Sequence, residues 1–205
     1  MNFAIIGLLI AFSMCYAATA QETSQDIPSG LSAMEYLLLG ERNQKLGRPE
    51  IARACIKHAI LLEPSTEIGK RASLFLQSNI PKYPVPSEAE GANNRGSNFL
   101  LTKNLQAAIV VLDHCCQSYP QFEWPFYNLS CAYLTQGNAK LAKTYASKAV
   151  AINPSYSNGW LALANVYLME KDYRMAKDCA QKASQYDPDS ISAKKMLTFL
   201  QRIVH

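Results

Sequence analysis

The segment Phe126–Tyr133, with the sequence FYNLSCAY, decides the fold of this chain of 205 residues. It recurs 34 positions later as Trp160–Tyr167, WLALANVY, with an aromatic residue, a Leu, a small residue and a Tyr in the same places. The same shift also carries three alanines and a proline onto residues of the same type: Ala142 onto Ala176, Ala146 onto Ala180, Ala149 onto Ala183 and Pro154 onto Pro188. Coincidences at a single period indicate an internal repeat.

The spacing of the aromatic and aliphatic residues predicts a first helix in each repeat. Phe126, Leu129 and Tyr133 follow one another in steps of three and four, which places them on one face of a helix. Trp160, Leu163 and Tyr167 repeat these steps.

The spacing of the alanines predicts a second helix with a stripe of small side chains, at Ala142, Ala146 and Ala149, along which another helix can approach closely. Gly137-Asn138 is typical of the turn between the two helices, and Pro154 disfavours helix at the residue before it. Each pair is then an antiparallel hairpin with an apolar side too wide to hide alone, so we expect the pairs to stack.

These residues resemble the tetratricopeptide repeat, whose signature of Trp, Leu, small residue and Tyr, then spaced Ala and a closing Pro, is met closely at 123–156 and 157–190. The same spacing appears at 33–66, with Asn43 where the pattern has Tyr. A further unit at 89–122 is degenerate, because its first half lacks the aromatic residue and the Leu. The resemblance implies an all-α fold, a right-handed superhelical solenoid of antiparallel helix pairs with about four repeats and a C-terminal capping helix.

The phase of the repeat breaks between the first unit and the others. The segment Ile80–Pro86 has three prolines and favours an extended, stiff connector. We therefore expect this order: a signal peptide at 1–20, a polar tail at 21–32, the first repeat with a short helix at 33–80, a Pro-rich connector at 81–88, three repeats at 89–190 with the first degenerate, and a capping helix at 191–205.

The first twenty residues predict export. Residues 4–13 are an apolar run of signal-peptide length, and Ala18-Thr19-Ala20 has the small residues of a cleavage site. We place the cut after Ala20 and the protein in the periplasm or outside the cell. The alternative is an uncleaved segment that anchors the chain to a membrane, because no Lys or Arg precedes the run.

Composition and motifs narrow the function classes. A net charge of +4, with Lys and Arg mixed among Asp and Glu, offers no stripe for nucleic acid. The sequence has no motif of a hydrolase, metalloprotease or phosphate-binding loop, and we expect no enzyme activity, cofactor or small-molecule substrate. The cysteines and three scattered histidines lack metal-ligand spacing, so we expect no metal site.

The resemblance implies a protein or peptide partner, held in the hollow side of the solenoid that the first helices line. Helical geometry predicts that this groove is lined by Trp124, Tyr127, Cys131, Leu134 and Thr135 in one unit and by Asn158, Leu161, Asn165, Leu168 and Met169 in the next. Some of these residues could instead contact the neighbouring unit. Family members that hold chaperone carboxylate tails have Lys in this groove, whereas Tyr127 and Leu161 stand there, so we expect a different ligand.

Two other function classes remain open. One is a thiol-based redox or metal-handling protein that uses the adjacent Cys115 and Cys116. The other is a regulatory accessory subunit of an envelope enzyme, in which the first repeat and the connector dock the catalytic partner. The favoured hypothesis is a non-catalytic scaffold for protein–protein interaction.

Overall fold

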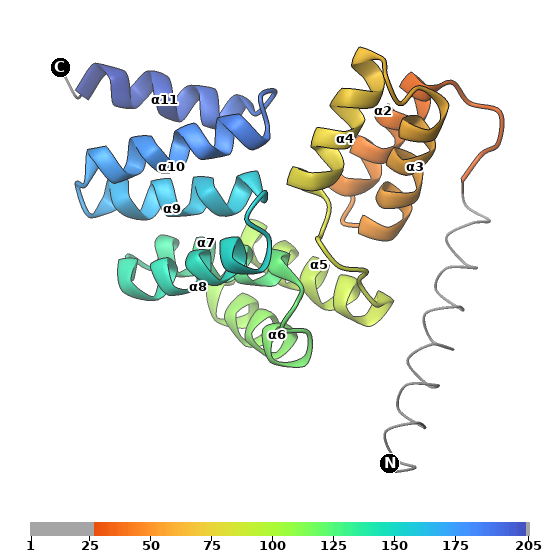
Figure 1. The fold of residues 1–205 in the computed structure, drawn as a ribbon. Coiled ribbons are helices and arrows are strands. Elements are labelled where there is room, and N and C mark those ends of the chain that lie inside the picture. The colour runs from red at the N-terminus through yellow and green to blue at the C-terminus, as the bar shows by residue number, and fades with distance from the viewer. Residues whose placement is uncertain (1–26, 204–205) are drawn as a thin grey trace, which may run out of the picture.

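A computed structural model describes residues 27–203 of the chain (Figure 1). The predicted signal peptide and most of the predicted polar tail lie outside the described residues. The described part consists of helices joined by short turns, with no strand between residues 27 and 203. The helices are α2 (Ala33–Lys45), α3 (Pro49–Leu62), α4 (Glu67–Asn79), α5 (Ser87–Leu101), α6 (Leu105–Ser118), α7 (Glu123–Thr135), α8 (Ala139–Ile152), α9 (Ser157–Met169), α10 (Tyr173–Tyr186) and α11 (Ile191–Ile203).

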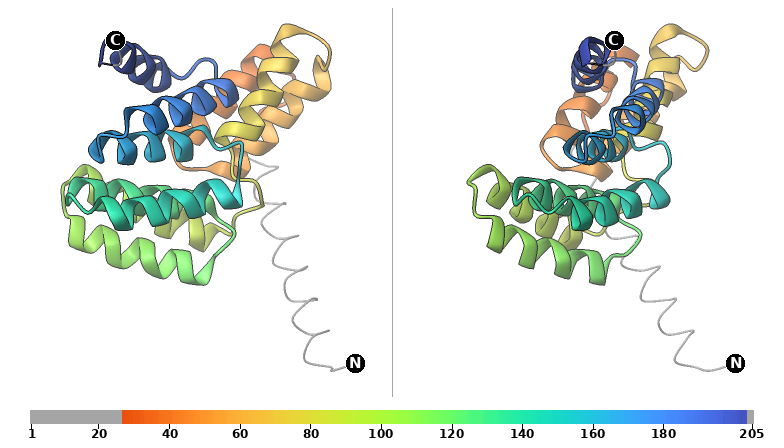
Figure 2. Two further views of the ribbon diagram at one scale, coloured as in Figure 1. Left: turned by 60° about the vertical axis from the view of Figure 1, so that its left-hand side comes forward. Right: turned by 90° about the vertical axis from the view of Figure 1, so that its left-hand side faces the viewer.

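Eight of these helices form four antiparallel pairs, α2–α3, α5–α6, α7–α8 and α9–α10. From α5 onward each helix packs on the one before it and the pairs stack in order, with α11 closing the stack on α10 (Figures 1 and 2). The predicted all-α helix-pair solenoid with a capping helix is therefore confirmed.

Small side chains allow the two helices of a pair to approach closely. Ala142, Ala146 and Ala149 on α8 are fully buried, and so are the alanines of the same stripe on α10. In α5 the aromatic residue and the Leu of the repeat are missing, but Ala92 and Gly96 are buried against α6. In the degenerate unit the two helices therefore still pack closely, although the large aromatic and Leu side chains are missing.

The turn between the paired helices requires a left-handed backbone at one residue. Gly47 and Gly137 adopt positive φ there, at 70° and 77°. Lys103 and Lys171 hold the equivalent places with φ of 60°, where a residue with a Cβ is strained. The turn geometry is therefore imposed by the packing of the pairs, even where the sequence does not favour it.

The helices α2, α3 and α4 form a unit beside the stack (Figure 1). Its core holds the fully buried Leu37, Ile56 and Ala72. Helix α4 contacts α9 and α10, and Arg71 binds both Glu41 within the unit, at 2.8 Å, and Asp189 before α11, at 3.4 Å. The connector that follows is extended and packed, because Ile80 and Pro81 are fully buried.

Among residues 27–203, no helix is both long and apolar enough to cross a membrane.

The close approach of α5 and α6 can be tested with two glycines of one helix. A Cβ at Gly96 would clash with the side chain of Leu112, which is fully buried and has no room to retreat. We expect Gly96→Ala to lower the free energy of unfolding by about 1–3 kcal/mol, measured by urea denaturation.

Gly91→Ala is the matched control, because the nearest atom to its new Cβ is Arg95 Nη1 at 3.5 Å. Here the higher helix propensity of Ala should raise the unfolding free energy by up to about 1 kcal/mol. Equal effects of the two substitutions would contradict the close packing at Gly96.

Candidate functional site

The first helices of the pairs form the inner row of the stack. Helix α7 contacts both α5 and α9, whereas α6, α8 and α10 make no comparable contact with one another in the described part of the chain. Helices that converge lie on the inside of a curved stack. The side chains of α7 and α9 that remain open on this row therefore define the candidate groove.

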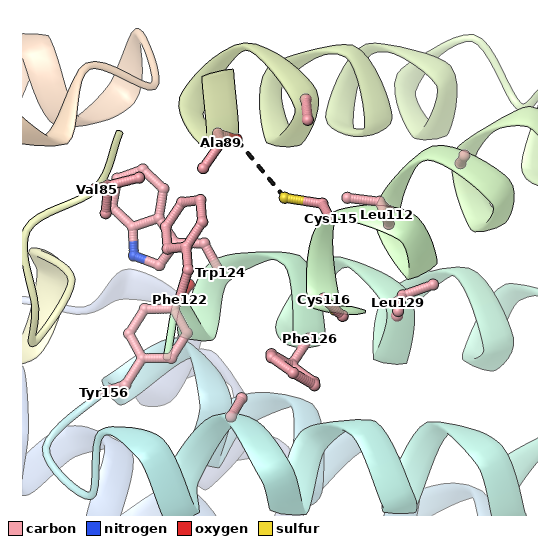
Figure 3. Close-up of a cluster of buried hydrophobic side chains, with 13 residues drawn as sticks. Val85, Ala89, Leu112, Cys115, Cys116, Phe122, Trp124, Phe126, Leu129 and Tyr156 are labelled. Carbon is pink, nitrogen blue, oxygen red and sulfur yellow. Dashed lines mark hydrogen bonds between the residues drawn. The ribbon is translucent and has the colours of Figure 1, made fainter. Parts of the chain in front are cut away.

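Two of the predicted groove residues are covered. Trp124 is 6% exposed and packs with Phe122 and with Val85 of the connector (Figure 3). Leu161 is also 6% exposed and belongs to a cluster with Ala183 of α10 and Ala193 of α11. Both side chains are engaged in contacts with neighbouring segments.

Tyr127 and Cys131 form a half-buried pair one turn apart on α7. The Tyr127 ring meets Tyr156 edge to face, with centroids 5.8 Å apart. The neighbouring Cys131 thiol, together with burial, raises the pKa of the Tyr127 hydroxyl well above its usual range. Tyr127 thus stays neutral and fixes the junction of two repeats.

The other predicted groove residues remain at least partly open. Leu134, Asn158 and Leu168 are half-buried, and Thr135, Asn165 and Met169 are exposed. These partly or fully exposed groove residues lie mainly in the C-terminal halves of α7 and α9. They form a surface of apolar side chains and amides, and the role of this surface in binding stays a prediction.

A junction that the sequence did not indicate holds the connector. Arg53 Nη2 donates to the carbonyl oxygens of Pro81 at 2.6 Å and Tyr83 at 2.9 Å. Glu50 Oε1 accepts from the Val85 N–H at 3.0 Å and also binds Arg53. The connector is thus tied to α3 by its backbone.

Glu123 ties the same connector to the stack. Its Oε1 accepts from the Lys82 N–H at 2.9 Å and from Asn153 Nδ2 at 2.8 Å, while the carboxyl group is fully buried. Burial raises the pKa of Glu123, although the hydrogen bonds from Asn153 and Lys82 oppose this shift. The junction of the N-terminal unit with the stack is therefore built on a desolvated acid.

Glu90 is a second perturbed acid near this junction. Burial raises the pKa of Glu90 to about 7, and the negative charge of Glu50 acts in the same direction, against a hydrogen bond and the charge of Arg48. The two carboxyl groups come from α3 and α5, so this charge interaction links the N-terminal unit to the stack.

The five cysteines within residues 27–203 offer little for thiol chemistry. Cys55, Cys115, Cys116 and Cys179 are buried free thiols, and Cys131 is a half-buried one. Burial raises the pKa of every one of them, to about 11 for Cys115 and Cys179, which disfavours the reactive thiolate. The Cys115 thiol donates to the Ala89 carbonyl at 3.7 Å (Figure 3). Within residues 27–203, no group of His, Cys, Asp and Glu side chains is placed to hold a metal ion.

Stacked helix pairs with an open inner row define a helical-repeat solenoid. Residues 133–198 match the family model of the tetratricopeptide repeat. These residues therefore resemble the tetratricopeptide repeat, and the described part of the chain has the helix-pair fold of that class.

Solved structures share the fold. The tetratricopeptide domain of Sgt2 from Aspergillus fumigatus is 22% identical with a TM-score of 0.55, covering 58% of this chain and 80% of that one. The first such domain of Spaghetti (RPAP3), bound to the HSP90 peptide SRMEEVD, is 18% identical with a TM-score of 0.54 and coverages of 58% and 96%. MamA from Desulfovibrio magneticus RS-1 is 20% identical with a TM-score of 0.50, covering 86% of this chain and 87% of that one.

Curated relatives match only in part. A UDP-N-acetylglucosamine–peptide N-acetylglucosaminyltransferase of Giardia intestinalis is 32% identical over 100 residues, which is 48% of this chain and 7% of that protein. The general transcription factor 3C polypeptide 3 of Homo sapiens is 21% identical over 124 residues, 60% of this chain and 14% of that protein. The chain thus spans a small part of the length of each.

The raised pKa of Glu90 predicts a pH-dependent stability. The native state holds this proton more tightly than the unfolded chain, so the contribution of Glu90 to stability falls as pH rises from about 4.5 to about 7. We therefore expect the difference in unfolding free energy, Glu90→Gln minus the natural chain, to increase between pH 4.5 and 7. Above pH 7 this difference should stay constant. Chemical denaturation at a series of pH values measures the difference.

Glu88→Gln, at an exposed position two residues earlier on α5, should follow the natural chain throughout. A constant difference between Glu90→Gln and the natural chain from pH 4 to 8 would contradict the assignment.

Proposed function

We propose that this protein is a non-catalytic scaffold that binds an apolar or amphipathic segment of a partner protein on the inner row of its repeats. The observation that carries the proposal is the open surface at Leu134, Asn165, Leu168 and Met169, because the neighbouring side chains of the same helices are buried. Leu and Met side chains adapt to apolar ligands, and the Asn amide can bind backbone groups of a peptide.

The relatives support a peptide as the kind of ligand. The Spaghetti domain named above binds an HSP90 peptide. The present groove differs in chemistry from one for a carboxylate tail, since Tyr127 and Leu161 stand where a Lys is wanted and are themselves held by neighbouring repeats. An apolar ligand with few charges fits the open residues better.

We also propose that the protein is exported to the periplasm or secreted, on the basis of the apolar run and the Ala18-Thr19-Ala20 site. These residues lie outside the described part of the chain. The thiol-based alternative has no support from the buried, high-pKa cysteines.

The groove is tested by Asn165→Ala with Met169→Ala, two exposed positions on α9 whose replacement leaves the helix packing intact. We expect the double variant to bind the natural partner at least tenfold more weakly, a loss of about 1.4 kcal/mol. The partner is obtained by affinity capture with the natural chain, and the affinities are then measured by calorimetry with purified components.

Lys140→Ala with Thr144→Ala provides the control, because both residues are exposed on α8 of the other layer. Loss of affinity in this control with none in the α9 variant would move the site to the outer face.

Export is tested separately by the mass of the protein recovered from an exporting cell. We expect a mature chain that begins at Gln21, because the signal peptidase needs small residues at positions 18 and 20. Ala20→Arg should block the cut and leave the full-length chain in the membrane fraction. A natural chain that keeps Met1 and sediments with membranes would favour the anchored alternative.

A further inference from the structure

Helix α11 continues the repeat but lacks a second helix within the described residues. The period of 34 places Ile191, Lys194 and Lys195 of α11 where α9 has Ser157, Trp160 and Leu161. Helix α11 packs on α10 as α9 packs on α8. It therefore has the position of a first helix in a further pair.

On α9, this face carries the second helix of the pair. Ser157 Oγ donates to the Ala183 carbonyl of α10 at 3.0 Å, and the Lys182 ammonium lies 4.2 Å from the centroid of the Trp160 ring. Leu161 is buried in the same region. The equivalent face of α11 is thus shaped for a helix lying alongside.

On α11, the face is open and partly apolar. The opposite side is anchored by the fully buried Ala193 and Leu200, whereas Ile191 is 68% and Phe199 is 48% exposed. A shallow hollow of about 320 Å³ runs along the open side, lined by Ile191, Lys194, Lys195, Thr198, Phe199 and Arg202. The lysines would be enough to make a capping helix soluble. The exposed Ile191 and Phe199 do not contribute to solubility, so they indicate a binding surface.

The charge of this face has one sign. Residues 191–203 include Lys194, Lys195 and Arg202 and no Asp or Glu. None of the three cations is in an ion pair with a carboxylate of residues 27–203, and the preceding Asp189 is paired with Arg71. The face is therefore complementary to an acidic surface.

We propose that an acidic amphipathic helix of a partner protein docks along this open face of α11. Its small or apolar side chains meet Ile191, Thr198 and Phe199, and its carboxylates meet Lys194, Lys195 and Arg202. This site uses none of the α7 and α9 residues of the candidate groove, so it adds a second binding surface to the scaffold.

A protein helix fits this face better than a lipid surface does. An interfacial helix presents an unbroken apolar face with its cations toward the polar side. On α11, Lys195 and Thr198 lie between Ile191 and Phe199, in the middle of the open face. Insertion of that face into a bilayer would bury the charge of Lys195. A partner helix with carboxylates would instead form an ion pair with Lys195.

The test uses a fluorescent peptide of 16 residues with Ala and Leu at helical steps of four and three and Glu at the flanking positions. A second peptide has Lys in place of each Glu. We expect the Glu peptide to bind the natural chain at least tenfold more tightly than the Lys peptide, by fluorescence anisotropy, with affinity falling as salt rises.

Variants locate the binding on α11. Lys194→Glu with Lys195→Glu should weaken the Glu peptide at least tenfold and should strengthen the Lys peptide, which a structural defect would not do. Phe199→Ser should weaken the Glu peptide without this reversal. Lys57→Glu with Lys140→Glu makes the same charge change at exposed positions on α3 and α8 and should have no effect beyond about twofold. The groove variant Asn165→Ala with Met169→Ala should also leave peptide binding unchanged.

Three results would overturn the proposal. The first is an equal effect of the α11 and control charge changes. The second is sedimentation of the natural chain with phosphatidylserine vesicles that Lys194→Glu with Lys195→Glu abolishes, while the Glu peptide does not bind. The third is a concentration-dependent dimer, seen by sedimentation velocity, that the same variant dissociates.

Discussion

Close contact between paired helices is the constraint on which the rest of this structure depends. Two helices approach closely only where the side chains between them are small, and the buried alanines of α8 and α10 meet that condition. The larger side chains of the first helices are then left to bridge one pair to the next. Small residues thus join the helices within a pair, and large residues join one pair to the next. This division of roles produces the stack, its inner row and the face at its end.

The N-terminal unit is attached by a different kind of interaction. Its contact with the stack includes a buried carboxyl group, Glu123, and a set of hydrogen bonds to the connector backbone. Such bonds are directional, so they define one orientation of the unit, whereas apolar contact alone tolerates several. The proline segment therefore sets a fixed geometry between the unit and the stack and does not act as a free tether.

The fold could be predicted because the residue types that define each helix face recur at a regular spacing along the sequence. Leu129 and Leu163 recur at one position since a helix face has the same needs in each pair. The groove was harder to predict, because the helical period identifies a face but not what covers it. Trp124 is covered by the connector and Leu161 by α10 and α11, segments whose positions are set by tertiary packing. The junction at Glu50, Arg53 and Glu123 had no sequence signal, since most of their partners there are backbone atoms common to every residue type.

The backbone bonding of the connector bears on which mutations it can accept. The side chains of Lys82, Tyr83 and Pro84 are exposed, while the main-chain groups of this segment carry the attachment. Most replacements at 82 and 83 would keep every bond that positions the unit. A proline at 82 or 85 would remove the backbone N–H that donates to Glu123 or to Glu50, so that a buried or half-buried carboxyl oxygen would lose one of its donors. The side chains at 82 and 83 can therefore vary widely. Proline, which is already the most frequent residue of this segment, is nevertheless excluded at 82 and 85.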